Sequence, residues 1–189
     1  RERYLTKVIE RRVEENTACY IEFASGSIEV DEMLGNNPAE IGRIKDNLIS
    51  LMQNEKFDLD SIVVTSSASP EGTAGFNERL SQKRSEGISE YFSRWMDNYQ
   101  DSLERERGFA VDEEGNIIVE KRTQIPMMGR SSGENWQMLD HLVERDTVMT
   151  EDEKKSYISS ADIKDIDQRE RSLQSLGCYR HMREKLYPH

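Results

Sequence analysis

The sequence predicts an α+β fold: a sheet of three or four strands with two helices on one face, followed by a helical extension. Between residues 17 and 125, short runs rich in β-formers alternate with amphipathic segments, and this order indicates crossover connections. After residue 133 only helical periodicity remains. We therefore expect an N-terminal extension or edge strand over 1–16, an α+β core over 17–125, and a helical insertion packed on the core over 126–189.

Four segments have the composition of β-strands. Residues 18–23 and 59–65 are the clearest, because both are rich in β-branched or aromatic residues. Residues 4–13 alternate only loosely and are expected to form a strand that could fill a sheet edge. Residues 116–121 would form the last strand of the core. Residues 126–133, which begin with proline and end with glycine, are predicted to form a loop.

Two helices are predicted within the core. The first should begin at Pro38, with Asn37 as its N-cap and Glu40 completing a capping box. Its buried stripe would comprise Ile41, Ile44, Leu48 and Met52. The second should begin near Asn77 and carry a stripe of Leu80, Arg84, Ile88, Phe92, Trp95 and Tyr99. A cation within that stripe either extends past the helix end or points into a site.

Helices are also expected in the C-terminal region. Residues 134–144 are amphipathic, and Thr150 with Glu153 forms a capping box that opens a second helix. Residues 162–176 form a third helix, which Gly177 should end, and residues 179–187 add a last turn or two.

Composition narrows the possible partners. The formal net charge of −11 argues against nucleic acid and against an anionic membrane surface, since both require a basic face. No run of 18 apolar residues is present, so no membrane-spanning helix is expected in these residues. Because the chain begins at Arg1, we interpret it as an excised or processed piece. Cys19 and Cys178 are expected to be free thiols, although a disulfide is an alternative.

The stretch from Ser66 to Ser85 joins a predicted strand to a predicted helix through a glycine-bearing loop. It resembles the ligand-binding segment of the OmpA-like family of cell-envelope domains. Residues that occupy the family's places in register are Gly72, Asn77, Leu80, Ser81, Arg84 and Ser85. The Ala-Ser-Pro-Glu-Gly loop is similar to that of large outer-membrane proteins of Bacteroidetes, which also resemble this chain at 36–40, 133–136 and 179–188.

The resemblance implies a βαβαβ mixed sheet and a non-catalytic role. A domain of this family associates with the diaminopimelate end of peptidoglycan peptides and tethers an outer-membrane protein to the wall, at the periplasmic face of the outer membrane. Arg84 would grip the ligand carboxylate, because a guanidinium matches it in a bidentate way. Asn77 would bind the ligand or brace the Ser69–Gly72 loop. Ser69 stands where the family has an acid, and Glu71 could supply the missing charge.

Other roles for these residues stay open. Arg84 could form a structural ion pair with Glu71, Glu78 or a C-terminal acid, and Asn77 could be a helix N-cap. The loop could be a turn without a ligand. The alternative function is therefore a protein-interaction module in a surface or fimbria-like assembly, one that has lost glycan binding and contacts a protein partner through the helical C-terminal region.

Catalytic, metal and cofactor sites are not predicted. The serine pairs at 66–67 and 131–132 lack a Gly-x-Ser-x-Gly elbow. No glutamate or cysteine stands at a zinc-binding spacing from His141 or His181. The glycines of the loop are too few and wrongly spaced for a nucleotide phosphate. No enzyme activity and no cofactor are expected.

Overall fold

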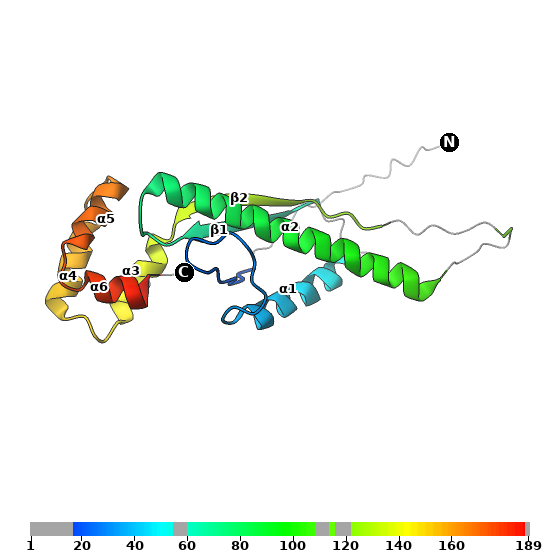
Figure 1. The fold of residues 1–189 in the computed structure, drawn as a ribbon, viewed down its shortest axis with the longest axis horizontal. Helices are drawn as coiled ribbons and strands as arrows, with labels where there is room; N and C mark the ends of the chain where they lie inside the picture. Colours follow the sequence, from blue (N-terminus) through cyan, green and yellow to red (C-terminus); the bar gives the residue numbers. More distant parts are fainter. Residues whose placement is uncertain (1–16, 55–59, 109–113, 116–121, 188–189) are drawn as a thin grey trace, which may run out of the picture.

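The computed structural model describes residues 17–54, 60–108, 114–115 and 122–187. Its helices and strands make a mixed α+β structure (Figure 1). The elements of the sheet half are α1 (Asn37–Met52), β1 (Ile62–Ala68), α2 (Ala74–Arg107) and β2 (Met127–Glu134). The elements of the helical unit that follows are α3 (Trp136–Arg145), α4 (Glu151–Ser160), α5 (Ile166–Gln174), α6 (Tyr179–His181) and the π-helix η1 (Met182–Leu186). The helical unit lies at the end of the molecule where α2 begins (Figure 1).

The sheet of the described residues consists of β1 and β2, which are parallel neighbours. Ile62 pairs with Met127 and Val64 with Gly129, and the register shifts between Ser66 and Ala68. Parallel strands need a crossover connection, and α2 provides it. One face of the sheet packs against the helices, whereas the alternate residues of the other face are exposed.

A glycine in β2 allows α2 to approach the sheet closely. A Cβ atom on Gly129 would lie 2.6 Å from the backbone nitrogen of Glu86 and 2.7 Å from the carbonyl carbon of Ser85. The side-chain amide of Gln82 donates to the Gly129 carbonyl and accepts from the Ser131 N–H. The hydroxyls of Ser81 and Ser131 lie 2.5 Å apart. This contact fixes both the distance and the rotation of α2 on the sheet.

The sheet half has its own hydrophobic core. Its buried members are Phe23, Ile41, Leu48, Ile88, Phe92, Met96 and Ile125. Ile44 and Met52 of α1 and Trp95 of α2 pack at its edge, as do Ile62, Val64 and Met127 of the sheet. The predicted apolar stripe of α1 and the centre of the α2 stripe are therefore confirmed.

One strand prediction and one loop prediction were wrong within the described residues. Residues 18–23 are not part of the sheet; Phe23 still packs into the core, and the main chain beside it bonds to side chains of α1. Residues 126–133 were expected to be a loop, but Met127–Glu134 is β2. Its glycines and serines are weak strand formers, and tertiary pairing with β1 and α2 overrides that preference. The strands predicted at 4–13 and 116–121 lie outside the described residues.

The role predicted for Asn37 was also wrong. Asn36 is the N-cap of α1 and makes no side-chain capping bond. The amide of Asn37 is instead buried: its Oδ1 accepts from the Glu22 N–H, and its Nδ2 donates to the carbonyls of Glu22 and Asp31. Glu40 accepts from the Tyr20 N–H and from Arg43 rather than closing a capping box. These side chains hold the segment before α1 against the helix.

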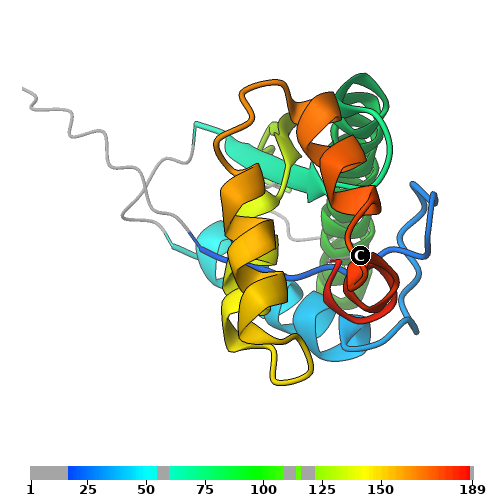
Figure 2. The same cartoon turned by 90° about the vertical axis from the view of Figure 1, so that its left-hand side faces the viewer.

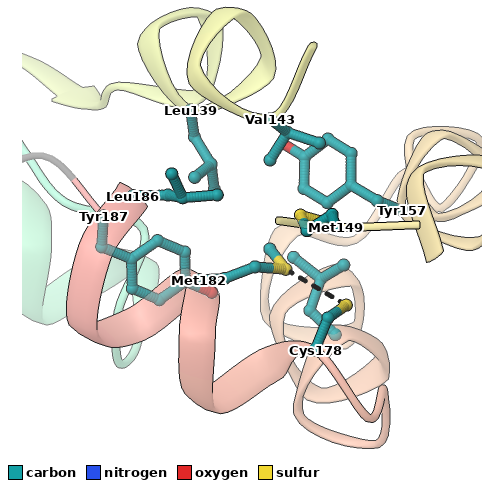
Figure 3. Packing of buried hydrophobic residues seen from close by; sticks show 9 residues of the cluster. Leu139, Val143, Met149, Tyr157, Cys178, Met182, Leu186 and Tyr187 are labelled. Atoms are coloured by element: carbon teal, nitrogen blue, oxygen red, sulfur yellow. Dashed lines mark hydrogen bonds between the residues drawn. The ribbon is translucent and has the colours of Figure 1, made fainter. Parts of the chain in front are cut away.

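The helical unit has a second core, shown in Figure 3. It contains Leu139, Val143, Met149, Tyr157, Leu173, Cys178, Met182, Leu186 and Tyr187, none of which belongs to the core of the sheet half. The Thr150–Glu153 capping box is confirmed. The third helix is shorter than predicted, because α5 begins at Ile166 with Asp165 as its N-cap and ends at Gln174, before Gly177.

We predict that Gly129→Ala destabilises the protein by about 1–3 kcal/mol, because the added methyl group overlaps the α2 backbone, which cannot rotate away. Urea unfolding followed by circular dichroism would measure the change. Gly42→Ala in α1 is the matched control. Its Cβ would meet no atom within 4 Å, so this change should stabilise the protein by roughly 0.5–1 kcal/mol. Equal stability of the two variants would contradict the close-contact account.

A second prediction concerns Asp146, which ties the C-terminal turn (residues 179–187, with α6 and η1) to the connection between α3 and α4. Its carboxylate accepts from the N–H groups of Val148 and Met149 and lies 3.0 Å from Nε2 of His181. Partial burial raises the pKa of Asp146, but the hydrogen bonds from Met149, His181 and Val148 outweigh it and hold the pKa below its usual 3.8. Ionised Asp146 therefore stabilises the fold above about pH 4, and this contribution is lost as the pH falls through the lowered pKa.

Between about pH 5 and pH 2 the free energy of unfolding should thus fall more steeply in the wild type than in Asp146→Asn. The fluorescence of Trp136, in a Trp95→Phe background, would report the helical unit. Asp162→Asn removes an exposed acid for which the structure gives no such hydrogen bonds, and it should keep the wild-type slope. Parallel curves for the wild type and Asp146→Asn would exclude this role.

Candidate functional site

The Ser69–Gly72 turn connects β1 to α2, as predicted. Gly72 has a φ of +99°, which a side chain would strain, and it redirects the chain into the helix. The N-cap of α2 is Thr73, whose hydroxyl accepts from the Phe76 N–H. The N-cap role considered for Asn77 is therefore wrong, since the helix begins three residues before it.

Asn77 instead braces the turn. It is 2% exposed, and its Nδ2 donates to the Glu71 carbonyl at 3.1 Å and to Oε1 of Glu134 at 2.6 Å. The other oxygen of Glu134 accepts from the indole N–H of Trp136. The amide of Asn77 thus links the turn to the end of β2 and to the start of the helical unit.

Arg84 is buried beneath the segment that precedes α1. The residue is only 4% exposed. Its Nε donates to the Ser27 carbonyl at 2.9 Å, and its Nη2 donates to the Ala24 carbonyl at 3.4 Å. The guanidinium lies 4.7 Å from the centre of the Phe23 ring. Burial lowers the pKa of Arg84. No carboxylate among the described residues pairs with it, so the alternative of a structural ion pair with Glu71, Glu78 or a C-terminal acid is not found there.

The two other predicted site residues of the turn, Ser69 and Glu71, have different surroundings. The hydroxyl of Ser69 is shielded from solvent and has no hydrogen-bond partner among the described residues. Glu71 points outward, and its Oε1 lies 2.7 Å from Nε of Arg183 in η1. The Ser69 hydroxyl is therefore closed off from solvent, whereas the nearby acid Glu71 pairs with the helical unit.

A hollow of about 590 Å³ lies beside this ion pair. Its lining consists of Ser25, Glu71, Tyr179, Arg180, Arg183 and Glu184. The C-terminal turn that carries four of these residues lies next to the segment before α1 (Figure 2). A further link to the helical unit is the Asp167 carboxylate, which accepts from the N–H of Ala74 in the first turn of α2.

The structure thus brings together only part of the predicted site. Ser69, Glu71, Gly72 and Asn77 surround one turn, while Arg84 lies about two helical turns further along and faces residues 24–27. Sequence reasoning missed the contribution of the C-terminal turn to the hollow. The cluster of basic residues at 180–185 is a visible signal, but nothing in it indicates contact with a turn some 110 residues earlier.

Other candidate sites are not found in the part of the chain that the structure describes. Cys19 is exposed, Cys178 is buried, and both are free thiols. No group of three or more histidine, cysteine or acidic side chains there is placed to hold a metal ion. Among the same residues, no helix combines the length and apolarity needed to cross a membrane.

Comparison of the chain with protein-family models, with curated proteins and with solved structures finds no match in any of the three.

We predict that Arg84 stabilises the fold. Arg84→Ala should lower the free energy of unfolding by about 2–3 kcal/mol, because the carbonyls of Ala24 and Ser27 lose a charged donor. Hydrogen exchange should also accelerate around residues 23–28. Arg79→Ala, an exposed arginine on the same helix, is the control and should stay within about 0.5 kcal/mol of the wild type. A neutral effect of Arg84→Ala would mean that the guanidinium is free.

Proposed function

We propose that the chain is a non-catalytic interaction module of the cell envelope, with an OmpA-like ancestry, in which the peptidoglycan-binding arginine has become a structural residue. The burial of Arg84 carries this proposal. In the OmpA-like resemblance, this guanidinium must offer two parallel donors to a ligand carboxylate. Here Nε and Nη2 are directed at main-chain carbonyls, and residues 24–27 cover the group.

The turn supports the same conclusion. The family acid is replaced by Ser69, whose hydroxyl is shielded from solvent. A neutral hydroxyl cannot neutralise an ammonium, and a neutral hydrogen bond contributes about 1 kcal/mol less than a charged one. The two halves of the zwitterion site that the family uses are therefore both absent from the surface, one by substitution and one by burial.

Exposed apolar side chains on the helical unit favour contact with a protein partner. Val148 is 68% exposed and Ile158 65% exposed, and Ile166 at the start of α5 is also exposed. A single exposed apolar side chain is common on protein surfaces. Three of them in one small unit provide apolar surface that a protein partner could cover. The proposed location is the periplasmic face of the outer membrane.

A peptidoglycan-binding assay distinguishes this proposal from peptidoglycan docking, the function that the resemblance implies. The protein would be sedimented with purified peptidoglycan sacculi, and its backbone amide shifts would be followed during titration with a diaminopimelate-containing muropeptide. We expect the protein to stay in the supernatant, with no saturable shifts at residues 77–84 at millimolar ligand, because the donors of Arg84 are already used.

Arg84→Met is the matched variant, since it keeps an unbranched side chain over the Phe23 ring while removing the charge. Cosedimentation, together with saturable shifts at residues 77–84 that disappear in Arg84→Met, would establish peptidoglycan docking instead.

A further inference from the structure

The hollow between the Ser69–Gly72 turn and the C-terminal turn is separate from Arg84. Ser25 lines the hollow, whereas the carbonyls of its neighbours Ala24 and Ser27 point to the Arg84 guanidinium. The segment 24–27 therefore contacts both the buried arginine and the open hollow. A volume of about 590 Å³ lies within the usual range of small-ligand sites, roughly 300–1,000 Å³.

Two arginines in this hollow are each held through one nitrogen. Nε of Arg183 lies 2.7 Å from Oε1 of Glu71, and Nε of Arg180 donates to Oε1 of Glu184 at 3.0 Å. Among the described residues, neither guanidinium has another hydrogen-bond or ion-pair partner. The terminal nitrogens of both can therefore donate to an added group, and a guanidinium binds best a group with two coplanar oxygens.

The backbone that carries these arginines is firmly anchored. Met182, Leu186 and Tyr187 are buried in the core of the helical unit (Figure 3). They lie in the sequence on either side of Arg183 and Glu184, which are exposed. The π-helical turn from Met182 to Leu186 is closed by the bond from the Tyr187 N–H to the Met182 carbonyl. Such turns are rare and recur at functional sites. Tyr179 adds a ring whose hydroxyl is turned away to the buried Glu170.

The charges of the lining define the group that fits. Two guanidinium groups and two carboxylates face the same space. A phosphate, with about two negative charges, would be repelled by Glu71 and Glu184 more strongly than a carboxylate would. A cationic group next to the ligand carboxylate would meet the second oxygen of Glu71. The lining therefore favours a carboxylate with a neighbouring positive charge.

From these observations we infer that the hollow is a docking site for a partner polypeptide segment in which an acidic and a basic side chain lie side by side. Arg183 and Arg180 hold the acid, and Glu71 holds the base. The inference deepens the proposed interaction function, because it names the chemistry of the partner, and it does not involve Arg84.

The test is an amide-shift titration of the intact chain with the blocked dipeptide acetyl-Lys-Glu-amide. Saturable shifts are expected at Ser25, Glu71 and residues 179–184, with a dissociation constant in the millimolar range. Acetyl-Lys-Gln-amide lacks the carboxylate and should cause no saturable shift. Inorganic phosphate should bind more weakly than the first peptide, because of its higher negative charge.

Arg183→Lys is the informative variant, because lysine keeps the charge and the contact with Glu71 but lacks the second donor of the fork. It should weaken binding of acetyl-Lys-Glu-amide about tenfold. Arg145→Ala removes an exposed arginine of the same unit outside the hollow and should leave the affinity unchanged.

Absent shifts with acetyl-Lys-Glu-amide would overturn the inference, as would equal binding of acetyl-Lys-Gln-amide or an unaffected Arg183→Lys. If muropeptide caused shifts at Ser25, Glu71 and residues 179–184 and the dipeptide did not, the inference of a polypeptide partner would be overturned. Muropeptide shifts at residues 77–84 that depend on Arg84 would overturn the proposed function but would not affect the inference about the hollow. The two failures are therefore distinguishable.

Discussion

The contact between Gly129 and the backbone of α2 is the constraint on which the rest of the structure depends. Only a residue without a side chain lets the helix lie this close to β2, with Ser81 and Ser85 against the strand and Gln82 bonded along it. This seating fixes the rotation of α2. Successive residues of a helix are separated by about 100°, so a helix that turns Ser85 to β2 must turn Arg84 to the flank. That flank is covered by residues 24–27, and the guanidinium is buried there.

Arg84 illustrates how a residue that a sequence resemblance assigns to ligand binding can have a structural position instead. A guanidinium has five N–H donors and no acceptor, so main-chain carbonyls can accept from it in place of a ligand carboxylate. The carbonyls of Ala24 and Ser27 take this part, and the Phe23 ring covers the group. Removing this buried donor would take the Nε bond from the Ser27 carbonyl, whereas the Ala24 carbonyl keeps the bond from the Ser27 N–H. A motif match at this position is thus compatible with a structural role.

The two halves of the molecule have separate cores and are joined mainly by polar contacts. The Glu71–Arg183 ion pair, the bond from Ala74 to Asp167, and the chain from Asn77 through Glu134 to Trp136 all run between them. All three converge on the turn between β1 and α2. Partly exposed ion pairs contribute little to stability, about 0–1 kcal/mol each, but they orient side chains. These contacts between the two halves therefore add little to the stability of the fold, and their main effect is to position charged groups around the hollow.

The sequence by itself determined the features that depend on neighbours along the chain. The apolar stripe of α1, the strand, turn and helix from Ile62 onward, and the Thr150–Glu153 capping box follow from spacing and local hydrogen bonds. Tertiary structure alone decided β2, whose serines and glycines form a strand because β1 and α2 supply partners. It also decided the burial of Arg84 and the meeting of Glu71 with Arg183. The groups in those contacts are separated by about 57 to 112 residues, and no local pattern records which of them will meet.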